Sequence, residues 1–244
     1  MAEIEIQWAA REAADRAQGV VLVIDVIRAF SVAAYAMAGG ARAIWLVRTV
    51  EEALALRERQ PDALLIGEVG GRRITGFDYD NSPSRMAEAD VRGRLLIQRT
   101  GAGTQGAVAA SGAAFLLPCA LVNAHATAAY ARQLATRTQG IITLLPTAAP
   151  VEDGDKPAIE DHVCGEYVEA LLRGQLDAAE VLARGIARLH AVGRFEIFAQ
   201  GYPDFPAADV AAVLAADHFA FALEGRRERW KGIEYISVQR VDMV

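Results

Sequence analysis

Two carboxylate side chains stand directly after short apolar segments of the chain. Asp25 follows the apolar run 20–24, and Glu68 follows the apolar run 63–67. A carboxylate at the end of a hydrophobic strand is costly to desolvate unless it pairs, caps a helix or binds a metal ion. Arg28 could neutralise Asp25 or bind an oxyanion through its planar guanidinium. The alternative is a structural ion pair with Asp25 capping the next helix, and both interpretations stay open.

A glycine-rich loop surrounds Glu68 and runs on to residue 84. Gly70 and Gly71 permit a close backbone approach or a positive φ. Ser82 and Pro83 have the residue types of a helix N-cap and first helical position. Free N–H groups at such a helix start favour an anion, although a capped helix without a ligand explains the same residues.

A second glycine-rich loop occupies residues 99–106. Gly101, Gly103 and Gly106 spell GxGxxG between a predicted strand and a predicted helix. The acidic residue that a dinucleotide site needs about 20 positions later is missing. The loop therefore indicates a phosphate or sulfonate site at a helix N-terminus, with a nucleotide-binding oxidoreductase as the alternative.

A third acidic group opens the predicted helix 159–173. Glu160 and Asp161 lie in its first turn, where negative charge is favourable for the helix dipole. Together with Asp25 and Glu68 they could complete an oxygen-rich site for Mg²⁺, which takes few carboxylates, several waters and substrate phosphate.

Alternating strands and helices must position these loops. Apolar runs predict strands at 20–24, 43–47, 63–67, 94–98, 115–117 and 141–145, and 234–241 alternates like a closing edge strand. Helices are predicted at 30–39, 50–59, 104–110, 124–136, 159–173 and 178–191. This order is typical of an α/β fold, a three-layer α/β/α arrangement around a mostly parallel sheet.

Composition excludes several function classes. The 244 residues carry a net charge of −6 and are 53% hydrophobic, which excludes wholesale disorder and gives no global field for nucleic acid. No apolar run reaches the ~18 residues of a membrane helix, and no signal peptide is visible. Cys119 and Cys164 have no paired spacing, so we expect a reducing, cytoplasmic setting.

The order of the motifs resembles the 2-phosphosulfolactate phosphatase family. That family shows a DVLRA-type segment, then GERGG, GFD and NSP, then a TTNGT-type loop, then A-x-E-D at a helix start. Here the corresponding segments are DVIRA at 25–29, GEVGG at 67–71, GFD at 76–78, NSP at 81–83, GT at 103–104 and AIED at 158–161. The resemblance covers about residues 20–175. We expect one domain, 1–244, and a division of it into two closely packed subdomains stays open.

The resemblance implies a function and a set of site residues. It implies a Mg²⁺-dependent hydrolysis of 2-phospho-3-sulfolactate, in coenzyme M biosynthesis, and hence a small anionic phosphorylated substrate. The expected catalytic residues are Asp25, Arg28, Glu68 and Asp161, and the expected metal ligands are Asp25, Glu68 and Asp161. The expected substrate-binding residues are Gly70, Gly71, Asp78, Asn81, Ser82, Thr100, Gly101, Gly103 and Thr104.

Two loops depart from the family pattern. Ala102 replaces an Asn, and Leu145-Pro146-Thr147 replaces a Cys-Ala-Gly segment. These changes leave the physiological substrate open, and they keep a non-catalytic anion-binding homologue as a second alternative. A homodimer also stays open.

Overall fold

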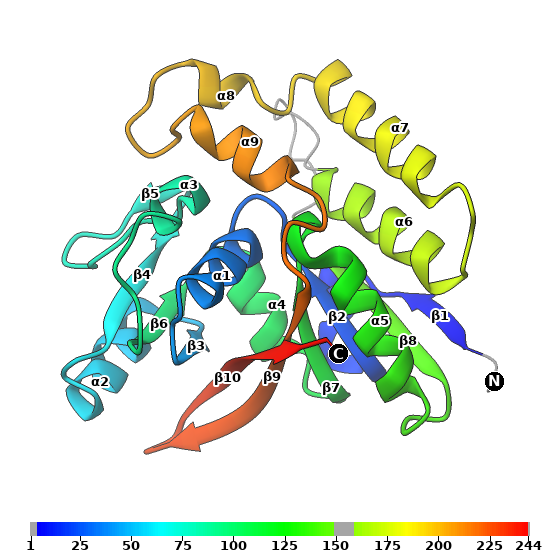
Figure 1. Cartoon of the computed structure of the whole chain (residues 1–244). Coiled ribbons are helices and arrows are strands. Elements are labelled where there is room, and N and C mark those ends of the chain that lie inside the picture. Colours follow the sequence, from blue (N-terminus) through cyan, green and yellow to red (C-terminus); the bar gives the residue numbers. More distant parts are fainter. Residues whose placement is uncertain (1–3, 149–158, 244) are drawn as a thin grey trace.

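The computed structural model describes residues 4–148 and 159–243. It is an α/β structure with helices packed on a large sheet, as Figure 1 shows, and the predicted fold class is confirmed. The strands are β1 (Glu5–Trp8), β2 (Gly19–Ile24), β3 (Ala43–Val47), β4 (Leu64–Val69), β5 (Arg72–Arg73), β6 (Leu95–Arg99), β7 (Ala113–Cys119), β8 (Ile141–Pro146), β9 (Phe221–Trp230) and β10 (Ile233–Asp242). The α-helices are α1 (Ala29–Ala38), α2 (Val50–Arg59), α3 (Pro83–Met86), α4 (Gly103–Ala109), α5 (Ala124–Ala135), α6 (Glu160–Leu172), α7 (Ala178–Ala191), α8 (Glu196–Ala199) and α9 (Ala208–Leu214).

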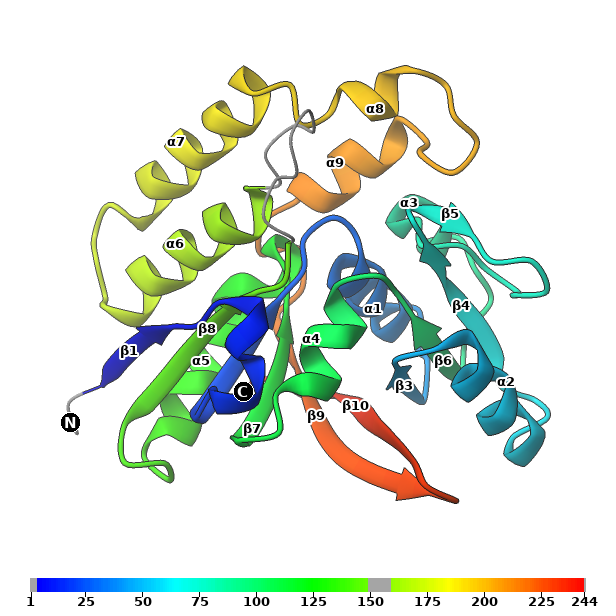
Figure 2. The ribbon, with the colours of Figure 1, turned by 180° about the vertical axis from the view of Figure 1, so that it is seen from behind.

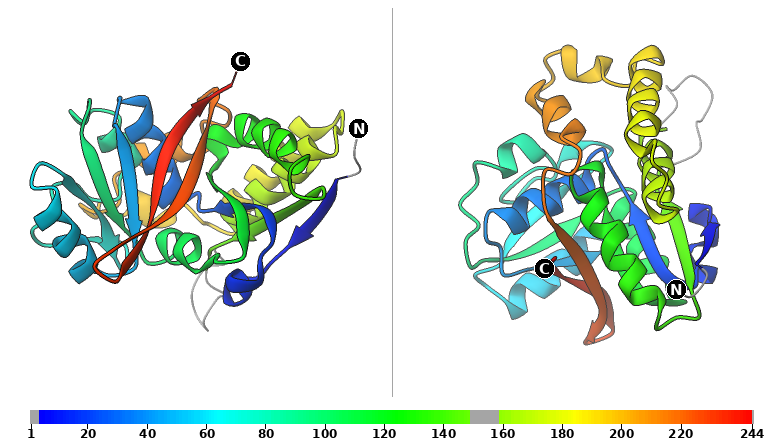
Figure 3. Two further views of the ribbon diagram at one scale, coloured as in Figure 1. Left: turned by 90° about the horizontal axis from the view of Figure 1, so that it is seen from below. Right: turned by 45° about the vertical axis from the view of Figure 1, so that its right-hand side comes forward.

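The sheet consists of two parallel groups joined by an antiparallel hairpin. Its strand order is β1-β8-β2-β7-β9-β10-β3-β6-β4-β5. Strands β1, β8, β2 and β7 pair in parallel, as do β3, β6 and β4. The β9–β10 hairpin lies between the two groups and pairs antiparallel with both, which Figure 3 shows from below.

The prediction of an edge strand at 234–241 is wrong. Strand β10 lies inside the sheet, between β9 and β3. Its residues Ile236, Ser237 and Val238 pair with β3 on one side, while all of β10 pairs with β9 on the other. The partner strand escaped prediction because residues 224–229 read Glu-Gly-Arg-Arg-Glu-Arg, a composition that is rare in interior strands.

The twist of the sheet brings the carboxyl ends of both parallel groups to one side. Three successive antiparallel pairings, β7–β9, β9–β10 and β10–β3, make the two groups run in opposite senses. Six steps in the strand order separate β2 from β4, and at about 20–25° a step they accumulate roughly 120–150° of rotation. This rotation offsets most of the reversal, so the ends of β2 and β4 both point to the upper part of Figure 1.

Strand β2 is the centre of the layered part of the fold. Val21 and Val23 face a core shared with α1 and α4, whereas Val20, Leu22 and Ile24 face a separate core shared with α5 and α6. All five side chains have no exposed surface. This two-sided burial explains the continuous apolar run, and it places β2 between two helical layers as predicted.

The C-terminal helices form an arch over the sheet ends. Helix α7 packs on α6, and α9 contacts the short helix α3. In Figures 1 and 2 α7 lies above α6, and the chain from α8 to α9 lies above β5 and α3. Within the part of the chain that the structure describes, no helix combines the length and the apolar character needed to cross a membrane.

Candidate active site

Asp25 is buried at the end of β2 and caps α1. Its Oδ1 accepts a hydrogen bond from the N–H of Ala29 at 2.9 Å. Its Oδ2 faces the start of α4, where a Cβ atom on Gly103 would lie only 2.6 Å away. The capping interpretation of Asp25 therefore holds, and the absence of a side chain at Gly103 leaves room for the carboxylate.

Glu68 joins the two glycine-rich loops. Its Oε2 accepts from the N–H of Gly71 at 2.6 Å, and its Oε1 accepts from the N–H of Gly101. Gly101 and Gly103 belong to the same loop, so this loop touches Glu68 at one point and Asp25 at the next. Asp25, directly after β2, and Glu68 thus meet across one loop, although Glu68 lies within β4 and not after the strand as predicted.

Asp161 lies in the first turn of α6 and accepts hydrogen bonds from backbone amides of other segments. Its Oδ1 accepts from the N–H of Val26 at 2.8 Å, and its Oδ2 accepts from the N–H of Ala148 at 2.8 Å. The hydroxyl of Thr147 lies 3.4 Å from Asp25 Oδ2 and 3.5 Å from Asp161 Oδ2. Asp25 and Asp161 are therefore neighbours on either side of this hydroxyl.

The buried carboxylates raise one another's pKa. Burial, with smaller contributions from the charges of Glu160 and Glu68, raises the pKa of Asp25 to about 6, against the lowering effect of the Ala29 amide. Burial and the charge of Asp25 raise the pKa of Asp161 well above its usual value. Arg194 makes its two hydrogen bonds, at 2.7 and 2.6 Å, to Glu160, and it also interacts with the charges of Asp161 and Asp25 without a hydrogen bond to either. A buried pair of this kind favours either a proton or a cation beside it.

The donor set at this pair fits Mg²⁺. Over the described ranges, no three His, Cys, Asp or Glu side chains are placed to hold one metal ion. Magnesium commonly binds through only one or two carboxylates, and water and substrate oxygens complete its ligands. Asp25 and Asp161 could supply the two carboxylates. Both oxygens of Glu68 accept backbone amides, as do both oxygens of Asp161. The three-ligand set that includes Glu68 stays a prediction.

Arg28 points away from Asp25. Its guanidinium donates to Asp209 Oδ2 at 2.9 Å, to the carbonyl of Asp204 at 2.6 Å and to the carbonyl of Gly71 at 3.2 Å. Of the two interpretations left open for Arg28, the ion pair with Asp25 does not form, because the partner of Arg28 comes from the C-terminal arch. The catalytic role of Arg28 stays a prediction.

The glycines of the GxGxxG pattern serve close packing. A Cβ on Gly103 would meet Asp25, and a Cβ on Gly106 would lie 2.6 Å from Cγ2 of Thr147. Carboxylates rather than cations line the loop, which is unfavourable for a dinucleotide pyrophosphate. Thr100 and Thr104 brace the loop, since the Thr100 N–H donates to Thr104 Oγ1 at 2.9 Å.

The predicted site residues in the loop between β4 and α3 make different contacts. Asp78 accepts from the N–H of Leu65 at 2.8 Å and pairs with Arg57 at 3.1 Å, so it braces β4. Asn81 is buried, and its Oδ1 has no hydrogen-bond partner among the described residues. Ser82 caps α3 through the N–H of Arg85 at 3.3 Å, as predicted. Gly70 has a φ of +59° and makes the turn that follows β4.

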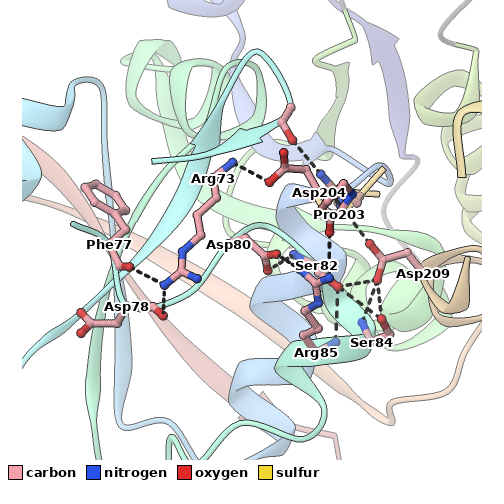
Figure 4. Close-up of polar contacts among 12 residues, drawn as sticks. Arg73, Phe77, Asp78, Asp80, Ser82, Ser84, Arg85, Pro203, Asp204 and Asp209 are labelled. Atoms are coloured by element: carbon pink, nitrogen blue, oxygen red, sulfur yellow. Dashed lines mark hydrogen bonds and ion pairs between the residues drawn. The ribbon is translucent and has the colours of Figure 1, made fainter. Parts of the chain in front are cut away.

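Asp209 is the main residue that the sequence interpretation missed. It is fully buried in α9 and accepts from Arg28, from the hydroxyls of Ser82 and Ser84 at 2.6 Å each, and from the Ser84 N–H at 3.1 Å. Figure 4 shows this cluster between α3 and the arch. No local sequence pattern could predict the role of Asp209, because its partners lie 125 or more positions away in the chain.

Comparison with known proteins identifies the family. The family model described as 2-phosphosulpholactate phosphatase matches residues 8–191. A Bacillus subtilis protein named "Probable 2-phosphosulfolactate phosphatase" is 41% identical over 165 residues, 67% of this chain and 69% of that protein. Proteins of the same name from Deinococcus radiodurans and Thermus thermophilus are 45% and 43% identical over 124 residues, which is 50% of this chain and 52% of each relative. The family expected from the motif order is confirmed: this chain belongs to the 2-phosphosulfolactate phosphatase family.

Proposed function

We propose that this protein is a phosphatase that hydrolyses a small, multiply charged phosphomonoester of the 2-phosphosulfolactate type. Its family is one of phosphoric monoester hydrolases, and its curated relatives carry that substrate in their names. The observation that carries the proposal is the buried pair of Asp25 and Asp161, whose carboxylates lie on either side of the Thr147 hydroxyl, where a cation could replace a shared proton. Such a pair suits a cation that also binds the oxygens of a substrate phosphate.

Each residue has a separate task in this proposal. Asp25 and Asp161 would hold Mg²⁺, which supplies charge neutralisation and activation of water for attack on phosphorus. Asn81 would donate a side-chain hydrogen bond to the substrate phosphate. The loop at Thr100, Gly101, Gly103 and Thr104 would shape the site, with the N–H groups of Gly101, Gly103 and Thr104 donating to Glu68, Asp25 and Thr100. Glu68 would keep both glycine-rich loops in place through the amides of Gly71 and Gly101. We favour direct attack by water over a phosphoenzyme.

The test is phosphate release from a panel of phosphomonoesters. The panel contains 2-phosphosulfolactate, 2-phospholactate, which has a methyl group in place of the sulfomethyl group, and p-nitrophenyl phosphate. Each is assayed with Mg²⁺ and with EDTA. We expect the highest kcat/KM for 2-phosphosulfolactate and loss of activity in EDTA. Equal rates for all three esters would contradict the substrate class, and no release from any ester would favour a non-catalytic anion-binding homologue.

The composition of the chain bears on the cellular location and the partners of the proposed enzyme. Cys119 and Cys164 are both free and buried, which suits the proposed cytoplasmic location. The net charge of −6 offers no attraction for nucleic acid or an anionic membrane surface. A homodimer is compatible with the activity, and size-exclusion chromatography with light scattering distinguishes it from a monomer.

A further inference from the structure

We propose that Asp209 is a positioning residue of this phosphatase, which holds Arg28 and the turn at Ser82 so that the C-terminal arch closes over the active site. The inference rests on the proposed function, because it names a residue that serves the same site. Asp209 belongs to α9 and lies outside residues 8–191, the part matched by the family model.

Asp209 is saturated with donors from two other parts of the chain. Arg28, at the start of α1, binds its Oδ2, while the hydroxyls of Ser82 and Ser84 and the Ser84 N–H bind its Oδ1. The side chains of Arg28 and Asp209 are only 3% and 0% exposed. An ion pair this deeply buried cannot lose one partner without leaving the other charge uncompensated, in contrast to an exposed pair.

Arg28 connects the arch to the turn that follows β4. Besides Asp209, its guanidinium binds the carbonyls of Asp204 and Gly71 and lies 4.7 Å from the ring centre of Phe205. The ring of Phe205 in turn covers Gly71, where a Cβ atom would lie 2.5 Å from it. Gly71 has a φ of +78°, so both its conformation and its neighbour require glycine.

The contacts continue without a gap to the catalytic centre. Arg28 binds the carbonyl of Gly71, and the N–H of Gly71 binds Glu68. The other oxygen of Glu68 binds Gly101 in the loop that packs against Asp25. Asp209 therefore acts on Glu68 through Arg28 and one turn of backbone.

Few apolar contacts would replace this polar anchor. In α8 the buried side chain is Phe198, and in α9 the buried side chains are Asp209 itself and Val213. The ion pair therefore adds a buried polar contact to the few apolar contacts that Val213, Leu214 and Phe198 make.

The test compares Asp209→Ala with Asp217→Asn in kcat and KM on 2-phosphosulfolactate, with and without added formate. Asp217 is a matched control, because it also accepts from two distant groups, the N–H of His125 and the hydroxyl of Tyr167, but does not touch Arg28. We expect Asp209→Ala to lower kcat/KM by about 100-fold, since misplacement by an ångström has that effect. Formate should enter the vacated space beside Arg28 and restore part of the activity, and Asp217→Asn should retain wild-type kcat/KM.

Two results overturn the proposal. One is a folded Asp209→Ala variant with wild-type kcat/KM, and the other is a loss that formate does not restore, which indicates a merely structural role. If Asp209→Ala does not fold, Asp209→Asn takes its place, since it removes the charge and keeps the size. Wild-type activity in that variant, or a loss explained by unfolding, then counts against the proposal.

Hydrogen exchange separates this inference from the proposed function, because it needs no substrate. We expect the amides of residues 70–73 to exchange faster in Asp209→Asn than in the wild-type protein or in Asp217→Asn. Unchanged exchange at this turn would overturn the positioning role even if the enzyme is active. Faster exchange in a protein that releases no phosphate would instead leave the coupling intact and refute the proposed function.

Discussion

Replacing Asp25 with asparagine should stabilise the fold while it abolishes the reaction. Asp25 is fully buried, and burial raises the pKa of its carboxyl to about 6 from the usual 3.8. A carboxyl whose folded-state pKa exceeds its unfolded-state pKa binds its proton more tightly in the folded protein. Ionised Asp25 therefore lowers the free energy of unfolding at neutral pH, and a neutral amide removes that effect.

The magnitude follows from the two pKa values. A difference of about two pKa units corresponds to roughly 3 kcal/mol of destabilisation, fully present above pH 6. The amide of Asn keeps an acceptor oxygen for the N–H of Ala29, but its NH₂ group cannot accept the hydrogen bond that the N–H of Gly103 donates to Asp25. That loss costs about 1 kcal/mol, which leaves about 2 kcal/mol of net stabilisation. In a chain of this size, 2 kcal/mol raises the unfolding temperature by about 4–8 °C.

The assay is thermal unfolding of the wild-type protein and Asp25→Asn in EDTA, at pH 8 and at pH 4. At pH 8 the Asp25 carboxyl is ionised in both folded and unfolded states, so the variant should be the more stable protein. Near pH 4 the folded wild-type protein is already protonated at Asp25, and most of the advantage should disappear. A variant that is less stable than the wild-type protein at pH 8, or a difference that does not change with pH, would refute the electrostatic reasoning.

Three further outcomes are expected. Gly103→Ala should lower kcat/KM by about 100-fold and also lower the unfolding temperature, because its Cβ would lie 2.6 Å from Asp25 Oδ2. A wild-type kcat/KM together with a wild-type unfolding temperature, measured by kinetics and calorimetry, would contradict this prediction. Adding Mg²⁺ at tenfold its Kd should stabilise the wild-type protein by about 1.4 kcal/mol, and the same addition should leave the unfolding temperature of Asp25→Asn unchanged; equal shifts would exclude Asp25 as a ligand. Asp161→Asn should abolish Mg²⁺-dependent phosphate release in an endpoint phosphate assay; retained Mg²⁺-dependent turnover would remove Asp161 from the metal site.

Much of the fold could be predicted from local patterns. The continuous apolar run of β2 predicted a strand buried on both faces, and the Ser82-Pro83 pair predicted the start of α3. These features depend on neighbouring residues in the chain, so hydrophobic periodicity and capping residues reveal them. A shared site of Asp25 and Glu68 was also predicted, but the twist across the β9–β10 hairpin, on which their convergence depends, could not be predicted.

The remaining features depend on contacts between distant residues. The partner of Arg28 is Asp209, 181 positions later, so a search near Arg28 found only Asp25 as a candidate. Strand β9 is rich in charged residues, and its pairing with β10 is what makes it a strand. Sequence spacing carries no information about such tertiary partners.

The central claim, that Asp25 belongs to the catalytic centre of a phosphomonoesterase, is tested most directly by one kinetic comparison. Initial rates of phosphate release from 2-phosphosulfolactate are measured for the wild-type protein and for Asp25→Asn, at pH 7.5 with saturating Mg²⁺ and after circular dichroism has shown both to be folded. We expect turnover by the wild-type protein and no turnover above background by Asp25→Asn. Comparable rates for the two proteins would contradict it.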